Sequence, residues 1–129
     1  MIISNGIDLV EIARIKEAME KSPRFLQRIM TPLELEFLIK KGMRASSAAG
    51  IFAGKEAVSK VLGTGIGQIS WQEIEILNDV KGAPYVVLHG NAKHVASMKK
   101  INHILISISH DSRVAIASAV GQQINLKEG

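Results

Sequence analysis

The stretch at 45–62 constrains the fold more than any other part of the sequence. It is rich in alanine and other small residues, and Phe52, Val58 and Leu62 belong to an apolar face with helical spacing. A glycine-rich segment at 63–67 follows at once, and glycine commonly ends a helix because it adopts a left-handed backbone without steric cost. The sequence therefore predicts one long helix at 45–62, whose small residues let neighbouring elements pack closely.

Helical signals precede this stretch, and strand signals follow it. We expect a first strand at 2–7 and then helices at about 9–21, after Ser22-Pro23, and from the capping box at Thr31 to near Gly42. Alternating polar and apolar residues predict strands farther on, with one short basic helix among them. These strands are 71–78, 85–89, 104–109 and 114–120, and the helix is 91–100. The order indicates an α+β fold, a single domain over 1–129, with helices mainly in the first half packed on an antiparallel sheet.

Composition narrows the class of protein. The 129 residues are 47% apolar with a net charge of +4, which suits a globular protein with an acidic or phosphate-bearing partner. The chain has no cysteine, no apolar window long enough to span a membrane and no signal-peptide pattern, so we expect a cytoplasmic protein without a membrane partner. One Trp, one Tyr and three Phe are few for a protein that stacks on single-stranded nucleic acid.

Glu56 and Lys60 lie four positions apart, so they share one face of the expected helix. One interpretation is a surface ion pair of little energetic weight. The small residues around them favour another, in which a ligand lies directly on that face. The following segment would then offer backbone N–H groups of Gly63, Thr64 and Gly65 to anionic oxygens, and the alternative is a simple helix cap.

Asp8 and His110 stand at the ends of expected strands. Asp8 is either the N-cap of the next helix or a ligand of a hard cation. Mg²⁺ commonly takes one or two carboxylates and completes its shell with water and phosphate oxygens, so Asp8 and Glu56 are the candidate pair. His110, beside Ser109, is either a solvated turn residue or a ligand-binding group. No role is expected for His89, His94 and His103.

A group of basic residues lies between positions 14 and 28. It consists of Arg14, Lys21, Arg24 and Arg28, with Phe25 among them. On a continuous helix these spacings would gather the cations on one face, while the acidic residues of the segment lie elsewhere. Such segregation favours docking of an acidic helical partner, and nucleic acid is the alternative.

Five motifs occur in order along the chain. They are G-I-D-L-V-E-I-x-R at 6–14, F-A-G-K-E-A-V-S-K at 52–60, G-T-G-I-G at 63–67, W-Q-E-I-E-I-L-N-D with G-A-P after it at 71–84, and I-S-I-S-H at 106–110. Together they resemble the holo-acyl-carrier-protein synthase family, the small members of the 4'-phosphopantetheinyl transferase superfamily. The resemblance covers nearly the whole chain.

The resemblance implies the 4'-phosphopantetheinyl transferase fold and an enzyme that supports fatty acid biosynthesis. The enzyme would move the phosphopantetheine group of coenzyme A onto a serine of apo-acyl carrier protein and release adenosine 3',5'-bisphosphate. By resemblance, Mg²⁺ is held by Asp8 and Glu56, Lys60 neutralises the pyrophosphate, and His110 lies at the coenzyme A phosphates. The family also implies a homotrimer with active sites between subunits, and carrier-protein docking on the 14–28 region.

Two points stay open at the level of sequence. The serine proton could pass to Glu56, to a water molecule on the metal, or to His110. The family commonly has an arginine where this chain has Ile51. That arginine is a candidate contact to the 3'-phosphate of coenzyme A. Arg44 is the candidate substitute, and preference for the 3'-phosphorylated coenzyme would be weaker.

Two other functions compete with the transferase. A non-enzymatic binding module would use the basic residues of the 14–28 region and need neither Mg²⁺ nor coenzyme A. A Mg²⁺-dependent pyrophosphohydrolase would need repeated acidic residues at close spacing, and the sequence has no such cluster.

Overall fold

A computed structural model describes residues 1–125 of the chain, and these residues contain two antiparallel sheets. The larger sheet has the strand order β1 (Ile2–Glu11), β5 (Val114–Gln122) and β4 (His103–His110), so the first and last described strands are neighbours. The smaller sheet is the hairpin of β2 (Ile74–Asn78) and β3 (Pro84–Leu88). The prediction of an α+β fold with antiparallel strands is confirmed.

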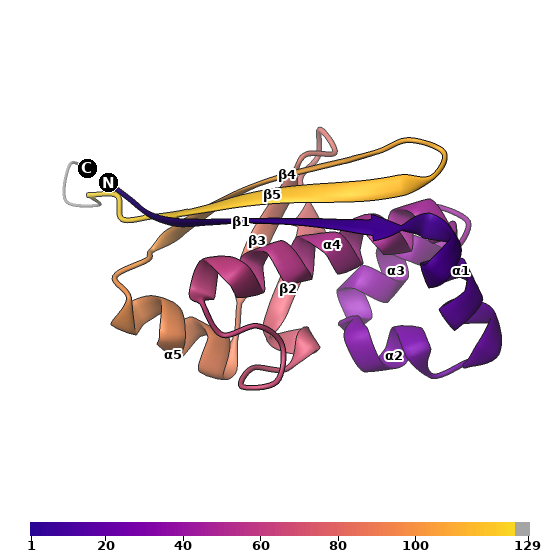
Figure 1. Cartoon of the computed structure of the whole chain (residues 1–129), viewed down its shortest axis with the longest axis horizontal. Coiled ribbons are helices and arrows are strands. Elements are labelled where there is room, and N and C mark those ends of the chain that lie inside the picture. The colour runs from indigo at the N-terminus through magenta and orange to yellow at the C-terminus, as the bar shows by residue number, and fades with distance from the viewer. Residues whose placement is uncertain (126–129) are drawn as a thin grey trace.

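The long helix lies along one face of the larger sheet, and shorter helices gather at its two ends (Figure 1). Within residues 1–125 the helices are α1 (Ile12–Lys21), α2 (Phe25–Ile29), α3 (Pro32–Lys40), α4 (Ala45–Leu62) and α5 (Gly90–Met98), with the 3₁₀ turn η1 (Trp71–Glu73) before β2. No described helix covers the opposite face of the larger sheet (Figure 1). None of the helices in this range is long and apolar enough to cross a bilayer.

Helix α4 approaches the larger sheet closely because small residues meet on both sides. Ala53 and Ala57 of the helix are buried, and so are the inward residues of β5, which are Ala115, Ala117 and Ala119. Gly6 of β1 marks the closest approach, since a Cβ built there would collide with the carbonyl oxygen of Ala57 and lie 2.9 Å from Cβ of Lys60. Strand β1 and α4 are therefore held together where the sequence predicted functional residues.

The bounds of α4 agree with the prediction, whereas the start of the chain does not. Strand β1 extends to Glu11, because its pairing with β5 continues as far as Glu11 and Val114. Helix α1 consequently begins at Ile12 and not near residue 9, and its N-cap residue, Glu11, makes no side-chain capping bond. The alternative of Asp8 as an N-cap is therefore wrong, since Asp8 lies inside a strand.

Capping boxes decide two other element starts. At α3 the predicted box forms, with the Thr31 side chain accepting from the N–H of Glu34 and Pro32 in the first turn. A second box, between Ser70 and Glu73, bends the backbone into η1. The strand predicted over 71–78 therefore begins only at Ile74.

Candidate active site

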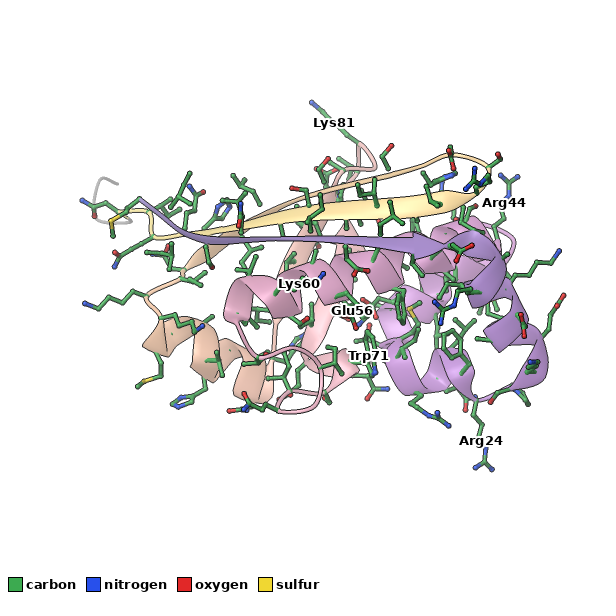
Figure 2. All side chains as sticks on the ribbon, viewed as in Figure 1. Arg24, Arg44, Glu56, Lys60, Trp71 and Lys81 are labelled. Atoms are coloured by element: carbon green, nitrogen blue, oxygen red, sulfur yellow. The ribbon has the colours of Figure 1, made fainter. Side chains whose placement is uncertain are left out.

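A groove of about 370 Å³ runs between β1, α1 and α4, and it brings together residues from distant parts of the sequence. Asp8 of β1 and Glu56 of α4 both line it. Lys60, one helical turn after Glu56, donates from Nζ to the carbonyl of Ile7 at 2.7 Å and lies 3.4 Å from Oδ1 of Asp8. Figure 2 shows Glu56 and Lys60 on the same stretch of α4, beneath β1.

The two carboxylates of this groove lie close enough to repel each other, although Arg14 and Lys60 are nearby. Burial raises the pKa of Glu56 above its ordinary value, the nearby negative charge of Asp8 raises it further, and Lys60 acts in the opposite direction. A cation between the two carboxylates would relieve their repulsion. Mg²⁺ commonly takes one or two protein carboxylates and leaves the rest of its shell to water and phosphate, so Asp8 and Glu56 are the residues that could hold it.

Aromatic side chains form the other wall of the groove, and the sequence had not singled them out for a role there. Phe52, four positions before Glu56 on α4, lines the groove together with Phe25. The ring of Trp71 lies on Phe52, with centroids 5.0 Å apart. The spacing of Phe52 and Glu56 was a usable signal, because residues four apart share a helix face.

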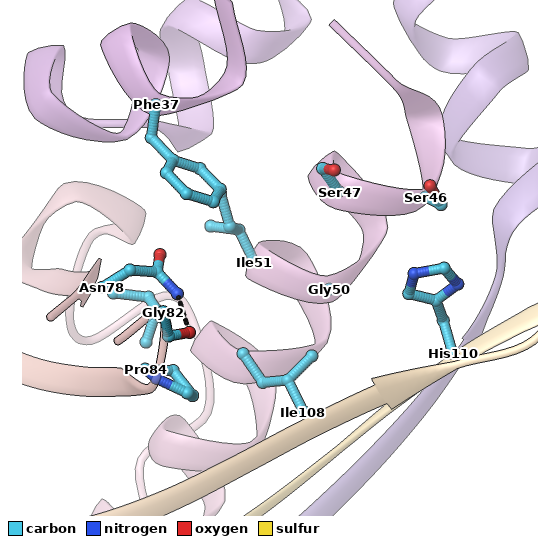
Figure 3. Close-up of a pocket in the computed structure, with 11 residues that line it drawn as sticks. Phe37, Ser46, Ser47, Gly50, Ile51, Asn78, Gly82, Pro84, Ile108 and His110 are labelled. Carbon is cyan, nitrogen blue, oxygen red and sulfur yellow. Dashed lines mark hydrogen bonds between the residues drawn. The ribbon is translucent and has the colours of Figure 1, made fainter. Parts of the chain in front are cut away.

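His110 lies in a second cavity of about 290 Å³, at the other end of α4 (Figure 3). Phe37, Ile51 and Ile108 make its apolar part, and Ser46 and Ser47 stand near the imidazole of His110. The turn after β4 fixes this histidine. Asp111 accepts there from the N–H groups of Arg113 and Val114 at 2.7 and 2.8 Å.

A basic hollow adjoins the His110 pocket. Its lining includes Lys40, Lys41 and Arg44, and it shares Ser46, Ser47 and His110 with the pocket. Ile51, where the resembling family commonly has an arginine, is buried in the pocket. The positive charge beside the cavity comes from Lys40 at the end of α3 and from Lys41 and Arg44 in the segment that follows. Ser109 is exposed and alternates with Ile108, so it lies on the outer face of the sheet, away from α4.

The structure divides the predicted catalytic residues into two groups. Asp8, Glu56 and Lys60 meet, but His110 borders a different cavity. The usual helical rise puts about 13 Å of axis between Ser47, beside His110, and Glu56. A single chain does not bring all four side chains to one point.

The glycine-rich segment after α4 is a helix cap. Gly63 adopts a left-handed backbone, and the N–H groups of Gly63, Thr64 and Gly65 donate to the carbonyls of Lys60 and Ser59. These amides are thus engaged at the negative end of the helix dipole. The arrangement does not support the prediction that they receive phosphate oxygens, and it agrees with the capping alternative.

The basic residues between 14 and 28 do not share one continuous helix. Helix α1 ends at Lys21 and α2 begins at Phe25, so the chain turns in the middle of the segment. Arg14 lines the groove, Phe25 is half-buried against the core, and Lys21 pairs with Glu17 at 2.6 Å. Arg24 and Arg28 are exposed, and Figure 2 shows Arg24 pointing away from the body of the protein.

Lys55 is a charged residue with a fully buried side chain. It lies between Gly54 and Glu56, yet its side chain is fully buried and forms an ion pair with buried Glu34 at 2.8 Å. Burial lowers the pKa of Lys55, and the charge of Glu34 opposes that change. One position along a helix turns the side chain by about 100°, so Lys55 and Glu56 face different environments.

The fold brings a carboxylate pair together with Lys60, and comparison with known proteins identifies the family. A model described as the 4'-phosphopantetheinyl transferase superfamily matches residues 4–117. The chain belongs to this superfamily, as the motifs predicted.

Within the superfamily, the chain is similar to holo-[acyl-carrier-protein] synthases. The chain is 51% identical to a holo-[acyl-carrier-protein] synthase of Alkaliphilus metalliredigens, over 93% of this chain and 98% of that protein. The crystal structure of the Helicobacter pylori synthase in complex with coenzyme A has a TM-score of 0.81 at 39% identity and covers 92% of this chain and 99% of that one. The Bacillus anthracis synthase in complex with CoA (3',5'-ADP) has a TM-score of 0.78 at 34% identity, over 96% and 99%.

Proposed function

We propose that this protein transfers the 4'-phosphopantetheine group of coenzyme A to a serine hydroxyl of apo-acyl carrier protein and so supports fatty acid biosynthesis. The serine oxygen forms a bond to the β-phosphorus of coenzyme A, and the bond from that phosphorus to the bridging oxygen breaks. Adenosine 3',5'-bisphosphate leaves, and the serine proton passes to a base. The observation that carries the proposal is that Asp8 and Glu56 line one groove, with Lys60 beside Asp8, in a chain that is 51% identical to a named synthase.

Asp8 and Glu56 are the proposed Mg²⁺ ligands. When bound, the ion would neutralise the pyrophosphate and stabilise the departing oxygen. Lys60 holds a fixed positive charge 3.4 Å from Asp8, where it can neutralise phosphate oxygens as their charge grows. Glu56, a water molecule on the metal and His110 are the three candidate acceptors for the serine proton, and Glu56 is the one that lines this groove.

A homotrimer with active sites between subunits is proposed for the assembly. The outer face of the larger sheet supports it, since Ile7, Leu9 and Leu105 are exposed there by 58%, 58% and 50% and no described helix covers them. The division of the predicted residues supports it as well. The Asp8–Glu56 groove of one subunit can face the His110 pocket of its neighbour, so that two chains complete one site.

In this arrangement the nucleotide end of coenzyme A occupies the His110 pocket. Phe37 and Ile51 offer apolar contact to a base, and Lys41, Arg44 and His110 stand where phosphate groups would emerge. Arg44 takes the place of the arginine that Ile51 replaces. Its position outside the pocket supports a weaker preference for the 3'-phosphorylated coenzyme, and Ser109 has only an indirect part because it lies on the outer face.

The acidic recognition helix of the carrier protein is proposed to dock at the corner between α1 and α2. Arg24 and Arg28 are exposed there, and Arg14 and Phe25 connect this corner with the Asp8–Glu56 groove. Lys21 completes the basic surface. A carrier bound at the corner would hold its serine close to the groove. The proposed compartment for this reaction is the cytoplasm.

Intact-mass spectrometry of apo-acyl carrier protein tests the proposal. After incubation with this protein, coenzyme A and Mg²⁺, the carrier should gain one phosphopantetheine group, and EDTA should abolish the gain. A reaction without coenzyme A is the control. Salt-sensitive binding of the carrier with no gain in mass, while an established synthase modifies the same sample, would instead identify a binding module.

A further inference from the structure

A charged cluster lies inside the protein and takes no part in the proposed chemistry. The Nζ atom of Lys55 is 2.8 Å from Oε1 of Glu34, and it donates to the carbonyls of Trp71 at 2.9 Å and Ile74 at 2.5 Å. Both charged side chains are fully buried. Lys55 thus has three oxygen partners, which is as many as an ammonium group can serve.

Glu34 is satisfied in the same way. Its Oε1 accepts from the N–H of Thr31 at 2.8 Å, and its Oε2 accepts from the N–H of Ile76 at 2.7 Å. The Lys55–Glu34 pair therefore ties three elements together, because Glu34 belongs to α3, Lys55 to α4, and the backbone partners Ile74 and Ile76 to β2.

The same three elements supply walls of the His110 pocket. Phe37 follows Glu34 by one turn of α3, and Ile51 precedes Lys55 by one turn of α4. Ile76, whose N–H is bound by Glu34, itself lines the pocket. Residues three or four apart share a helix face, so the Lys55–Glu34 pair lies directly behind the pocket lining on each element.

A gain in folding stability does not by itself explain why Lys55 and Glu34 are charged. Moving two charges into the interior costs desolvation that their attraction only partly offsets, and apolar replacements of similar size are often equally stable. The hydrogen bonds of this pair, in contrast, join α3, α4 and β2 at particular atoms, so they can set the spacing of the three elements. An ion pair at the junction of three pocket walls therefore suits a positioning role.

We propose that Lys55 and Glu34 are positioning residues that hold the walls of the His110 pocket at the spacing needed for the nucleotide end of coenzyme A. The proposal rests on the proposed function, since that function assigns the ligand. It predicts that disturbing the pair weakens coenzyme binding more than it slows turnover at saturating coenzyme.

The first test is the double variant Lys55→Met with Glu34→Gln, which removes both charges at nearly constant volume. The dissociation constant for adenosine 3',5'-bisphosphate, from calorimetry, and the KM for coenzyme A should each rise about tenfold, while kcat should change less than threefold. The variant Glu34→Asp keeps the charge but shortens the side chain by one carbon. It should raise the KM in the same direction while the fold stays intact.

Glu73→Gln is the matched control. Glu73 also accepts backbone N–H groups, from Ser70 and Asn91, but it does not line the pocket. It should lower the melting temperature without raising the KM for coenzyme A. An unchanged KM and dissociation constant in a folded double variant would overturn the positioning role, and so would an equal rise in the control.

The experiment distinguishes failure of the positioning role from failure of the proposed function. If the wild-type protein neither binds adenosine 3',5'-bisphosphate nor modifies the carrier, the function itself is wrong. If the wild-type protein does both and the variants match it, only the role of Lys55 and Glu34 is lost.

Discussion

The two ends of α4 border cavities of opposite chemical character. Near its start, the helix forms one side of the His110 pocket, whose rim carries Lys40, Lys41 and Arg44. Farther along, the same helix presents Glu56 to a groove that also holds Asp8. The first turns of α4 therefore border a cavity with cations beside it, and a later turn borders a groove with two carboxylates, although both belong to one helix.

This difference shows how a small chain can serve a long ligand with distinct parts. The positive end of the α4 dipole adds to the cations at the His110 pocket, and the carboxylates lie farther along, away from that end. Coenzyme A has a nucleotide, a pyrophosphate and a pantetheine arm, so it needs both kinds of surface. Because one chain keeps the two cavities apart, a second subunit has to supply the missing half in the proposed assembly.

The largest loss of turnover is expected from removing a carboxylate from the Asp8–Glu56 groove. Asp8→Ala removes one of two carboxylates from the groove, and metal ions supply several kcal/mol of transition-state stabilisation. We expect turnover to fall by about a thousandfold or more. Steady-state transfer of phosphopantetheine, measured across a range of Mg²⁺ concentrations, checks this.

Glu36→Ala is the control for that variant. Glu36 is an exposed carboxylate on α3, 3.6 Å from Lys40, and surface pairs of this kind contribute little. Its turnover should match the wild type. Near-normal turnover of Asp8→Ala would remove Asp8 from the metal site.

The next largest effect should come from preventing association of the subunits, because the groove of one subunit would then no longer face the His110 pocket of another. Leu105→Arg places a charge on the outer face of the larger sheet, outside both the groove and the His110 pocket. A charge buried in an apolar interface is costly, so sedimentation velocity should show smaller particles. Turnover should fall by about a hundredfold, as expected when reacting groups lose their alignment.

Val80→Arg provides the comparison for this variant. Val80 is a fully exposed apolar residue in the turn between β2 and β3, so a charge there should change neither the sedimentation nor the turnover. If Leu105→Arg sediments as the wild type does, the outer face is not the interface.

A smaller effect is expected from widening the contact between β1 and α4. In Gly6→Ala, the added methyl group would collide with the backbone of Ala57, which cannot turn away as a side chain can. Overpacking of this kind costs about 1–3 kcal/mol of unfolding free energy, measurable by urea denaturation. The affinity for Mn²⁺, measured by electron paramagnetic resonance, should fall with it, because Asp8 moves away from Glu56.

Gly54→Ala is the matched glycine control. There the added methyl would meet only the ends of isoleucine side chains, at 3.3 to 3.5 Å, and alanine favours helix. Unfolding free energy and Mn²⁺ affinity should stay close to the wild type. Equal losses in both variants would show general loosening of α4.

The sequence predicted α4 fully because its signals are local. Small residues with helical spacing and a glycine stop are enough to define Ala45–Leu62. The length of β1 depended instead on pairing with Val114, more than a hundred positions away, which no local pattern contains. For the same reason the local sequence allows Asp8 as an N-cap, although pairing with Ala117 keeps it inside the strand.

The candidate site was predictable in its parts but not in its arrangement. Asp8, Glu56 and Lys60 were chosen from residue type and spacing, and they do meet. The separation of His110 from them depends on where β4 ends relative to α4, which is a property of the whole fold. The burial of Lys55 was not predictable from its neighbours, because its partner Glu34 lies on another helix.

The smallest effect tests the groove through its own electrostatics. Burial and the charge of Asp8 raise the pKa of Glu56 in the folded state above the ordinary value of 4.5. A raised folded pKa means that Glu56 favours the native state below its unfolded pKa and loses that contribution as the pH rises through the folded pKa. Glu56→Gln should therefore melt slightly above the wild type at pH 7 without metal, and the difference should vanish at pH 4. Added Mg²⁺ should reverse the order at pH 7, since only the wild type gains from the ion. If the difference in melting temperature between the two proteins changes with neither pH nor Mg²⁺, the charge of Asp8 does not act on Glu56. The contrast between the two ends of α4 would then lose its electrostatic basis.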